Sequence, residues 1–178
     1  MNSLEIMFKE YDALRQEVLA SMTNRISILS FGIAAVGAIF TASIATYTNQ
    51  PSSLLISLIL TVILPFICAF ILFMWLGEYQ RMQRAGRFLV ELEQKINLEA
   101  SKEILTWETN LRKQRSHMNY PYNTTVLLLI VISGASQVIG LTNLGSSISI
   151  IVGLVIIGII IHIILYLYMV SLISKLQQ

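Results

Sequence analysis

The feature that most constrains this chain is a set of four apolar runs, none of which contains a charged side chain. They cover residues 26–47, 54–76, 124–142 and 148–170. Each has roughly 20 residues, and a helix of that length, rising about 1.5 Å per residue, crosses a hydrocarbon core about 30 Å thick. Because backbone groups inside lipid must bond within their own segment, we expect each run to be a transmembrane helix.

The composition favours a membrane protein over a soluble one. Hydrophobic residues make up 55% of the 178 residues and charged residues only 12%, which is more apolar surface than a globule of this size buries. The first 25 residues mix acidic and basic side chains without an apolar core, so we expect no signal peptide. The single cysteine, Cys68, lacks an intramolecular partner and metal-ligand spacing, and we predict neither metal nor cofactor.

The distribution of charge predicts the topology. The 12 Lys and Arg residues lie before the first run, between the second and third, or after the fourth, and the connections 48–53 and 143–147 carry none. Lys and Arg near span ends stay on the cytoplasmic side. We therefore expect a multi-pass protein of the inner (plasma) membrane with both termini in the cytoplasm. The net charge of +2 is too small to indicate a nucleic-acid partner.

Outside the spans, apolar residues recur at the three-four spacing of one helix face. The first such stripe is Leu4, Met7, Tyr11, Leu14 and Val18, followed by Met22 or Arg25. The second is Met82, Ala85, Leu89, Leu92 and Ile96, and the third is Ile104, Trp107, Leu111 and Met118. We expect the second span to continue into the cytoplasm as one long helix. A turn should follow near residues 97–101, with Asn97 or Ser101 as an N-cap, and Pro121 should open the third span.

These patterns together predict an all-α integral membrane protein with four transmembrane helices and a cytoplasmic helical hairpin bundled with the N-terminal helix. Residues 1–25 would form the cytoplasmic amphipathic helix and residues 26–77 the first two spans. Residues 78–122 would form the hairpin, residues 123–170 the last two spans, and residues 171–178 a cytoplasmic tail.

Two polar residues inside the spans are candidate functional groups. His162 lies in the fourth run, where an ionisable side chain favours a proton site or a gate. The alternative is a neutral imidazole that bonds to a neighbouring helix, for example to Gln137. No span contains a carboxylate, which argues against coupled antiport.

Span one carries small residues four apart, a pattern that lets helices approach closely. They are Ser30, Ala34, Ala38, Ala42 and Thr46, called here the small-residue ladder. The ladder packs against another span of the same chain, or it forms a subunit interface or, with Thr41, part of a pore wall. In span two, Pro65 predicts a kink.

Basic residues collect next to the second and third spans. They are Arg81, Arg84, Arg87, Arg112, Lys113 and Arg115, called here the basic collar. It fits contact with anionic lipid or, through bidentate arginine bonds, a phosphate-bearing ligand. Arg112 and His117 match the R-x4-H spacing of HEPN ribonucleases, but the cytoplasmic segments lack the soluble fold that such a site needs. We predict no catalytic residues and no enzyme.

The segment EYDALRQE at residues 10–17, ahead of a first span, resembles the start of many small bacterial multi-pass membrane proteins. The plan of a few spans with a charged cytoplasmic hairpin resembles, in architecture only, the membrane effectors of nucleotide-signalled antiphage systems. That resemblance implies a membrane-perturbing role triggered from the cytoplasm, and it assigns no functional residue.

The function that we predict is an oligomeric pore or channel-like effector, controlled from its cytoplasmic helical domain. Four helices are too few to enclose a wide aqueous path, so a pore requires a homo-oligomer in the bilayer. A cytoplasmic protein or a nucleotide would supply the signal. The alternative is a non-conducting membrane anchor or accessory subunit that docks a cytoplasmic partner.

Overall fold

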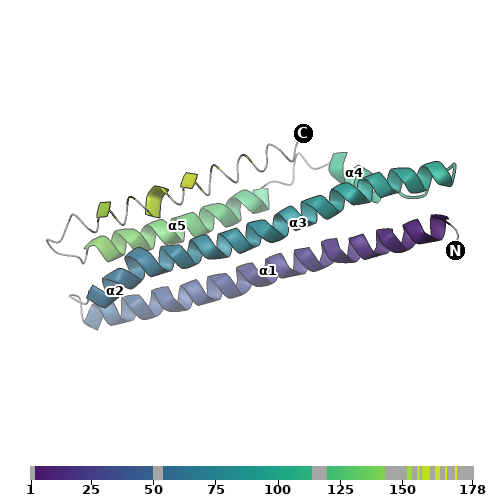
Figure 1. The fold of residues 1–178 in the computed structure, drawn as a ribbon. Coiled ribbons are helices and arrows are strands. Elements are labelled where there is room, and N and C mark those ends of the chain that lie inside the picture. Colours follow the sequence, from purple (N-terminus) through teal and green to yellow (C-terminus); the bar gives the residue numbers. More distant parts are fainter. Residues whose placement is uncertain are drawn as a thin grey trace. The chain divides into compact units, whose positions relative to one another are not determined.

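The computed structural model describes residues 3–49, 54–113 and 120–142, and beyond them only residues 152, 153, 156, 158–160, 163, 164, 167 and 171. The elements are α1 (Ser3–Asn49), α2 (Leu54–Leu58), the π-helix η1 (Ile59–Ile63), α3 (Leu64–Glu99), α4 (Trp107–Lys113) and α5 (Tyr120–Thr142) (Figure 1). No described residue lies in a strand, and the predicted all-α class is confirmed.

Three stretches of the described chain are helices long and apolar enough to cross a membrane. They are Ser3–Thr48, Leu54–Glu99 and Thr124–Thr142, and they contain the first three of the four predicted spans. The fourth predicted span, residues 148–170, lies for the most part outside the described residues. A count of four spans therefore stays a prediction.

The chain divides into two compact units. One contains Met1–Ser27 and Trp75–Asn123, and the other contains Ile28–Met74 and Thr124–Gln178. Every Lys, Arg, Asp and Glu residue except Lys175 belongs to the first, so we call it the charged unit and the second the apolar unit. Both α1 and α3 contribute residues to both units.

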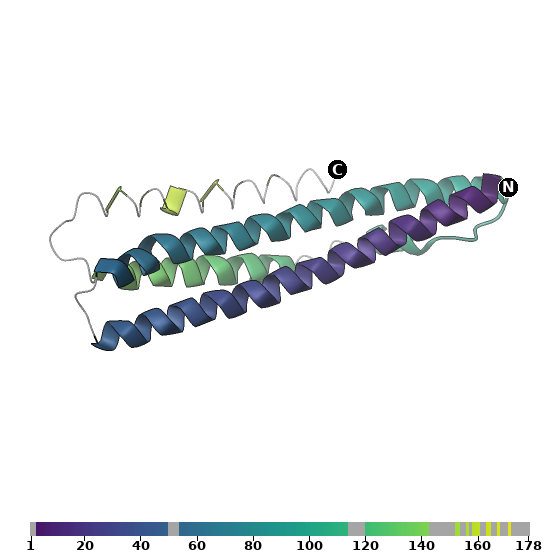
Figure 2. The same cartoon turned by 60° about the horizontal axis from the view of Figure 1, so that its bottom comes forward.

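The long helix predicted from the second span is present. Helix α3 has 36 residues and continues without interruption from Leu64 to Glu99, and α1 has 47 residues. Figure 2 shows both helices as unbroken ribbons. Helix α5 begins at Tyr120, so Pro121 lies in its first turn as predicted, where a missing backbone N–H costs nothing.

A π-helical turn lies directly before Pro65. In a regular α-helix the proline ring would collide with the carbonyl four residues earlier, and the proline donates no hydrogen bond. In η1 the N–H of Leu64 bonds instead to the carbonyl of Ile59, five residues back. The wider turn accommodates the proline ring. The sequence predicts a kink at Pro65, and the structure has a π-helical segment ahead of this residue.

In the apolar unit, glycines lie where helices approach one another. A Cβ atom added to Gly32 of α1 would lie 2.8 Å from Cγ2 of Ile71 on α3. One added to Gly140 of α5 would meet the hydroxyl of Thr61 and lie 3.0 Å from the same residue's backbone nitrogen. These contacts require the absence of a side chain at both positions.

The charged unit has a core of large side chains. Tyr11, Leu89, Leu92 and Ile96 form the buried cluster, called here the core cluster. Around it pack Met7, Phe8, Leu14, Val18 and Leu105. The first two predicted stripes are therefore confirmed, and the first continues through half-buried Arg25, because Met22 is exposed.

The third predicted stripe is wrong in its first half, whereas Leu111 is half-buried and Met118 lies outside the described residues. Ile104 and Trp107 are exposed, and α4 begins only at Trp107. The turn itself falls where predicted, since α3 ends at Glu99 and Ser101 has a φ of 51°. The side chain of Asn97 accepts hydrogen bonds from the N–H groups of Ile104 (2.8 Å) and Leu105 (2.9 Å), which holds these residues out of a helix.

Candidate functional site

The basic collar does not act as one set of unpaired cations. Arg81 forms an ion pair with Glu17 of α1, with Nε 2.8 Å from Oε1. This hydrogen bond, together with the charge of Glu17, raises the pKa of Arg81. The pair therefore joins α1 to α3 within the charged unit, and Arg81 is committed to a carboxylate.

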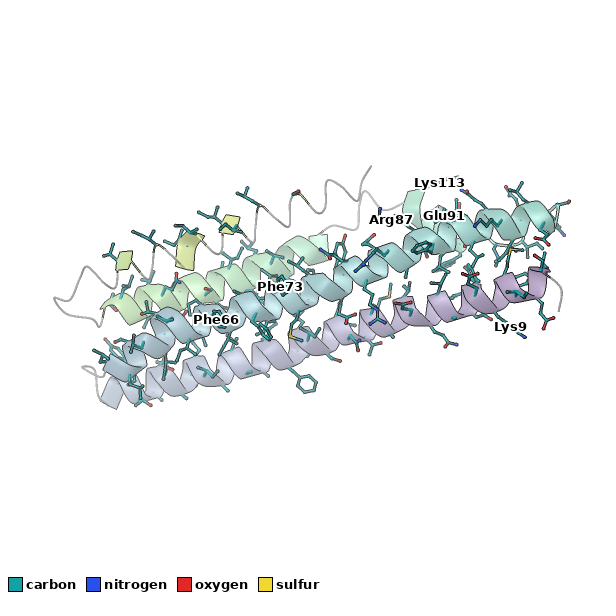
Figure 3. The ribbon with its side chains drawn as sticks, in the orientation of Figure 1. Lys9, Phe66, Phe73, Arg87, Glu91 and Lys113 are labelled. Carbon is teal, nitrogen blue, oxygen red and sulfur yellow. The ribbon has the colours of Figure 1, made fainter. Side chains whose placement is uncertain are left out.

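The remaining collar residues are only partly described. Arg84 and Arg87 on α3 and Lys113 on α4 have exposed side chains, and Figure 3 labels Arg87 and Lys113. The side chain of Arg112 and the whole of Arg115 lie outside the described residues. An anionic partner would thus meet Arg84, Arg87 and Lys113 at the surface of the charged unit.

Arg25 occupies an aromatic site that sequence reasoning missed. Its guanidinium carbon lies 4.7 Å from the ring centroid of Trp75 and 5.3 Å from that of Tyr79. The two rings are stacked with an interplanar angle of 6°, and Nη1 of Arg25 donates to the sulfur of Met82 at 3.5 Å. Aromatic faces attract a cation in this way when water is excluded. Trp75 and Tyr79 therefore form part of the interior of the charged unit.

Among the described ionisable residues of the charged unit, Glu93 is the most enclosed, with 0% of its surface exposed. Its Oε1 accepts hydrogen bonds from the Tyr11 hydroxyl (3.1 Å) and the backbone N–H of Glu108 (2.9 Å). Its Oε2 accepts from the backbone N–H (3.0 Å) and the hydroxyl (2.8 Å) of Thr109. A carboxylate here satisfies the first backbone donors of α4 and interacts favourably with the positive end of that helix.

The Glu93 carboxylate also affects the pKa of Tyr11. Burial and then the negative charge of Glu93 raise the pKa of Tyr11 from 10.0 to about 12. The phenol therefore stays protonated and donates to Glu93 throughout the physiological range. Nothing in the spacing of the apolar stripes pointed to Glu93, which lies beside the stripe through Leu89, Leu92 and Ile96.

Within the apolar unit, Gln137 of α5 is buried. Its amide nitrogen lies where a side chain on Gly158 would be. His162, the other polar candidate of the spans, lies outside the described residues. Contact between Gln137 and Gly158 is therefore observed, and the role of His162 stays a prediction.

The small-residue ladder of α1 is exposed at all five positions. In the described part of the chain a different face of α1, with Gly32 and Val36, is buried instead. Most of the fourth predicted span lies outside the described residues, so packing of the ladder against that span stays a prediction. Exposed residues of α3 in the same unit are large instead, as Phe66 and Phe73 show (Figure 3).

Among the described residues, no group of three or more His, Cys, Asp or Glu side chains is placed to hold a metal ion. The one fully buried carboxylate, Glu93, has its two oxygens engaged by four donors. These hydrogen bonds join helices, and the outward features of the described residues include the ladder and the exposed basic residues. No family model, no curated protein and no solved structure matches this chain.

Proposed function

We propose that this chain is a self-associating membrane protein that forms a pore-type assembly, in which the small-residue ladder of α1 meets another copy. It would lie in the inner (plasma) membrane with both termini in the cytoplasm. The charged unit would then be cytoplasmic, because Lys and Arg near span ends are retained on that side.

The observation that carries this proposal is the composition of the exposed face of α1. Lipid tails are as apolar as leucine, so large apolar side chains lose nothing by facing them, whereas small residues let a second helix approach closely. The exposed residues of α1 between Ser30 and Thr46 are Ser30, Phe31, Ala34, Ala35, Gly37, Ala38, Thr41, Ala42, Ala45 and Thr46. Only Phe31 among them is large. A second helix can pack closely against such a face.

The same face supports a path for solutes or ions. Three hydroxyl residues, Ser30, Thr41 and Thr46, are spread along it. The Thr46 hydroxyl donates to the carbonyl of Ala42 at 2.8 Å, which makes the surface weakly polar without an unpaired donor at that position. If copies are arranged around a common axis, those hydroxyl residues that do not contact a neighbouring copy would line a narrow, uncharged path.

The basic collar has a matching role in this proposal. Exposed Arg84 and Arg87 would contact anionic headgroups on the cytoplasmic leaflet, which attracts such residues by about 1 kcal/mol each. The trigger would be a cytoplasmic protein or a nucleotide. We assign it no residues.

The test of the interface compares one substitution on two exposed faces. Ala38→Leu enlarges the ladder, and Ala135→Leu makes the same change on an exposed position of α5. The first should lower the oligomeric fraction in lipid nanodiscs, and the leakage of dye from liposomes, by tenfold or more. The second should leave both unchanged. Purified wild-type protein that stays monomeric in lipid at every protein-to-lipid ratio would refute the proposal.

The orientation has its own test. In a Cys68→Ala background, single cysteines at Asn49 and Ser146 should react with an impermeant thiol reagent applied to intact spheroplasts. A cysteine at exposed Gln94 should react only after the membrane is opened. Reaction of the Gln94 position from outside would reverse the assigned sidedness.

A second function is favoured by a different surface. At the end of the charged unit, Leu98 is 80% exposed and Trp107 62% exposed, with Ile104 half-exposed nearby in sequence. Exposed large apolar residues of this kind are typical of protein contacts. A membrane anchor that docks a cytoplasmic protein would use them without conducting, and oligomers that release no dye from liposomes would favour that function.

A further inference from the structure

Two polar side chains of α3 hold the segment that follows the turn. Glu93 and Asn97 are four residues apart and so lie on one face of the helix. Glu93 accepts three hydrogen bonds from Glu108 and Thr109, and Asn97 accepts two from Ile104 and Leu105. Asn97 also donates to the carbonyl of Leu105 at 2.6 Å. Six hydrogen bonds to two side chains therefore attach residues 104–109 to α3.

The apolar attachment of this segment is small by comparison. Leu105 packs against the core cluster, whereas Ile104 and Trp107 are exposed. The pair of helices α1 and α3, in contrast, shares Tyr11, Leu89, Leu92 and Ile96 in the core cluster. The attachment of α4 thus depends on a buried carboxylate, and the attachment of α1 to α3 depends on apolar burial.

We propose that residues 104–113 form a releasable strap, which undocks as a unit from an intact α1–α3 pair when the Glu93 carboxylate is lost. In the sequence the strap precedes α5, which carries the third span. Undocking would free residues 104–113 from α3 ahead of that span. The Glu93 carboxylate would then decide whether the segment ahead of the third span is held by α3. This inference does not depend on whether the protein conducts.

The side-chain geometry shows why Glu93→Gln tests this strap. Each carboxylate oxygen accepts two hydrogen bonds. An amide has the same shape, but its NH2 group cannot accept. The hydroxyl at that position can rotate to accept from the NH2 group, whereas the backbone N–H there loses its acceptor and faces a donor. Hydrogen bonds to a charged group are stronger than neutral ones, and loss of their acceptor leaves the buried donors unsatisfied.

The experiment is hydrogen–deuterium exchange of the full-length protein in lipid nanodiscs, read by mass spectrometry. In Glu93→Gln, amides of residues 104–113 should exchange roughly 10- to 100-fold faster than in the wild type, while those of residues 85–96 stay protected. Glu91→Gln, which changes an exposed carboxylate of the same helix, should alter neither peptide. Tyr11→Phe removes only the bond from α1, so it should leave the strap protected.

Two results would overturn the strap. Equal acceleration of both peptides in Glu93→Gln would mean that α4 opens only together with the α1–α3 pair. Unchanged protection of residues 104–113 would mean that the carboxylate does not hold the segment. The Tyr11→Phe variant separates these outcomes from a general loss of the fold, because it perturbs the same carboxylate from the opposite side.

Discussion

Both units of this protein bury large side chains, and the apolar unit adds glycines that lie against neighbouring helices. In the charged unit, large side chains such as Leu89 and Ile96 fill the space between helices. In the apolar unit, Gly32 and Gly140 let helices approach until a single methyl group would not fit. The difference follows from the solvent. Water drives large apolar groups together, whereas lipid offers no such drive, and close backbone approach provides the contact instead.

The largest expected effect tests the apolar core of the charged unit. Leu89→Asp places a carboxylate in the core cluster, and we expect the free energy of unfolding of this unit to fall by at least about 4 kcal/mol. Faster proteolysis around residues 97–101, with the protein still inserted, would report the loss. Phe88→Asp is the matched control, because Phe88 is exposed, and it should cost about 1 kcal/mol or less. Equal digestion of both variants would mean that the cluster is not what stabilises this unit.

The next effect tests close approach in the apolar unit. Gly140→Ala should destabilise packing by about 1–3 kcal/mol, because its methyl group meets the backbone of Thr61 as well as a side chain. Gly134→Ala on the same helix has open space within 4 Å and gains helix propensity, so it should be neutral or stabilising by up to about 1 kcal/mol. The midpoint of SDS-induced unfolding in mixed micelles measures both. Identical unfolding midpoints for Gly140→Ala and Gly134→Ala would contradict the inference that close helix approach at Gly140 stabilises the apolar unit.

A smaller effect concerns Tyr11 and pH. Its pKa is about 12 in the folded protein, above the ordinary value of 10.0, so folding favours the protonated phenol. The resulting stabilisation is fully present below pH 10 and is lost as the pH rises from 10 to 12. Tyr11→Phe removes a hydrogen bond worth about 1–2 kcal/mol at neutral pH and should flatten this part of the pH dependence. If the free energies of unfolding of the wild type and of Tyr11→Phe fall in parallel above pH 10, Tyr11 does not contribute to the pH dependence of stability.

The smallest effect lies in the turn after α3. Ser101 has a φ of 51°, a conformation that costs a residue with a Cβ about 1–2 kcal/mol. Ser101→Gly should therefore stabilise the charged unit by about 0.5–1 kcal/mol, after the greater flexibility of glycine in the unfolded chain is subtracted. Lys102→Gly, one residue later, lacks this benefit and should destabilise the unit by a similar amount. Thermal unfolding followed by circular dichroism distinguishes the two signs.

The parts of the fold that follow from local pattern were predictable. The stripe from Met82 to Ile96 is buried as its spacing indicates, and the first three charge-free runs coincide with apolar helices. The long helix α3 follows from the absence of a proline after Pro65, and the turn lies within the predicted residues. These features depend on periodicity and on residues whose backbone preferences act locally.

The rest depends on contacts between distant positions. The stripe through Ile104 and Trp107 assumed a helix from residue 104, but the amide side chain of Asn97 binds the N–H groups of Ile104 and Leu105 and delays the helix to Trp107. Spacing alone does not reveal that competition. Glu93 was unpredictable for the same reason, since a carboxylate is buried only where donors from other segments converge on it.

The sequence predicts which residues belong to the candidate functional surfaces. It does not predict which of them are exposed or which other residues they contact. The sequence identifies the small-residue ladder, but periodicity does not say whether it meets its own chain or another, and the structure leaves it exposed. The basic collar was a cluster in sequence, yet Arg81 is paired with Glu17 from 64 positions earlier. The sequence predicts Arg25 only as a possible end of the first stripe, and its aromatic partners emerge from the packing of α1 on α3.

The uninterrupted helix α1 carries buried residues of both units. Tyr11 in the charged unit and Val36 in the apolar unit are both buried, and the 25 positions between them amount to almost seven whole turns of about 3.6 residues. One residue inserted between Ser27 and Ile28 would rotate one half of the helix against the other by about 100°. An insertion of four would rotate it by only about 40° beyond a full turn. An inserted length close to a whole number of turns therefore preserves the helical phase between these two buried positions of α1.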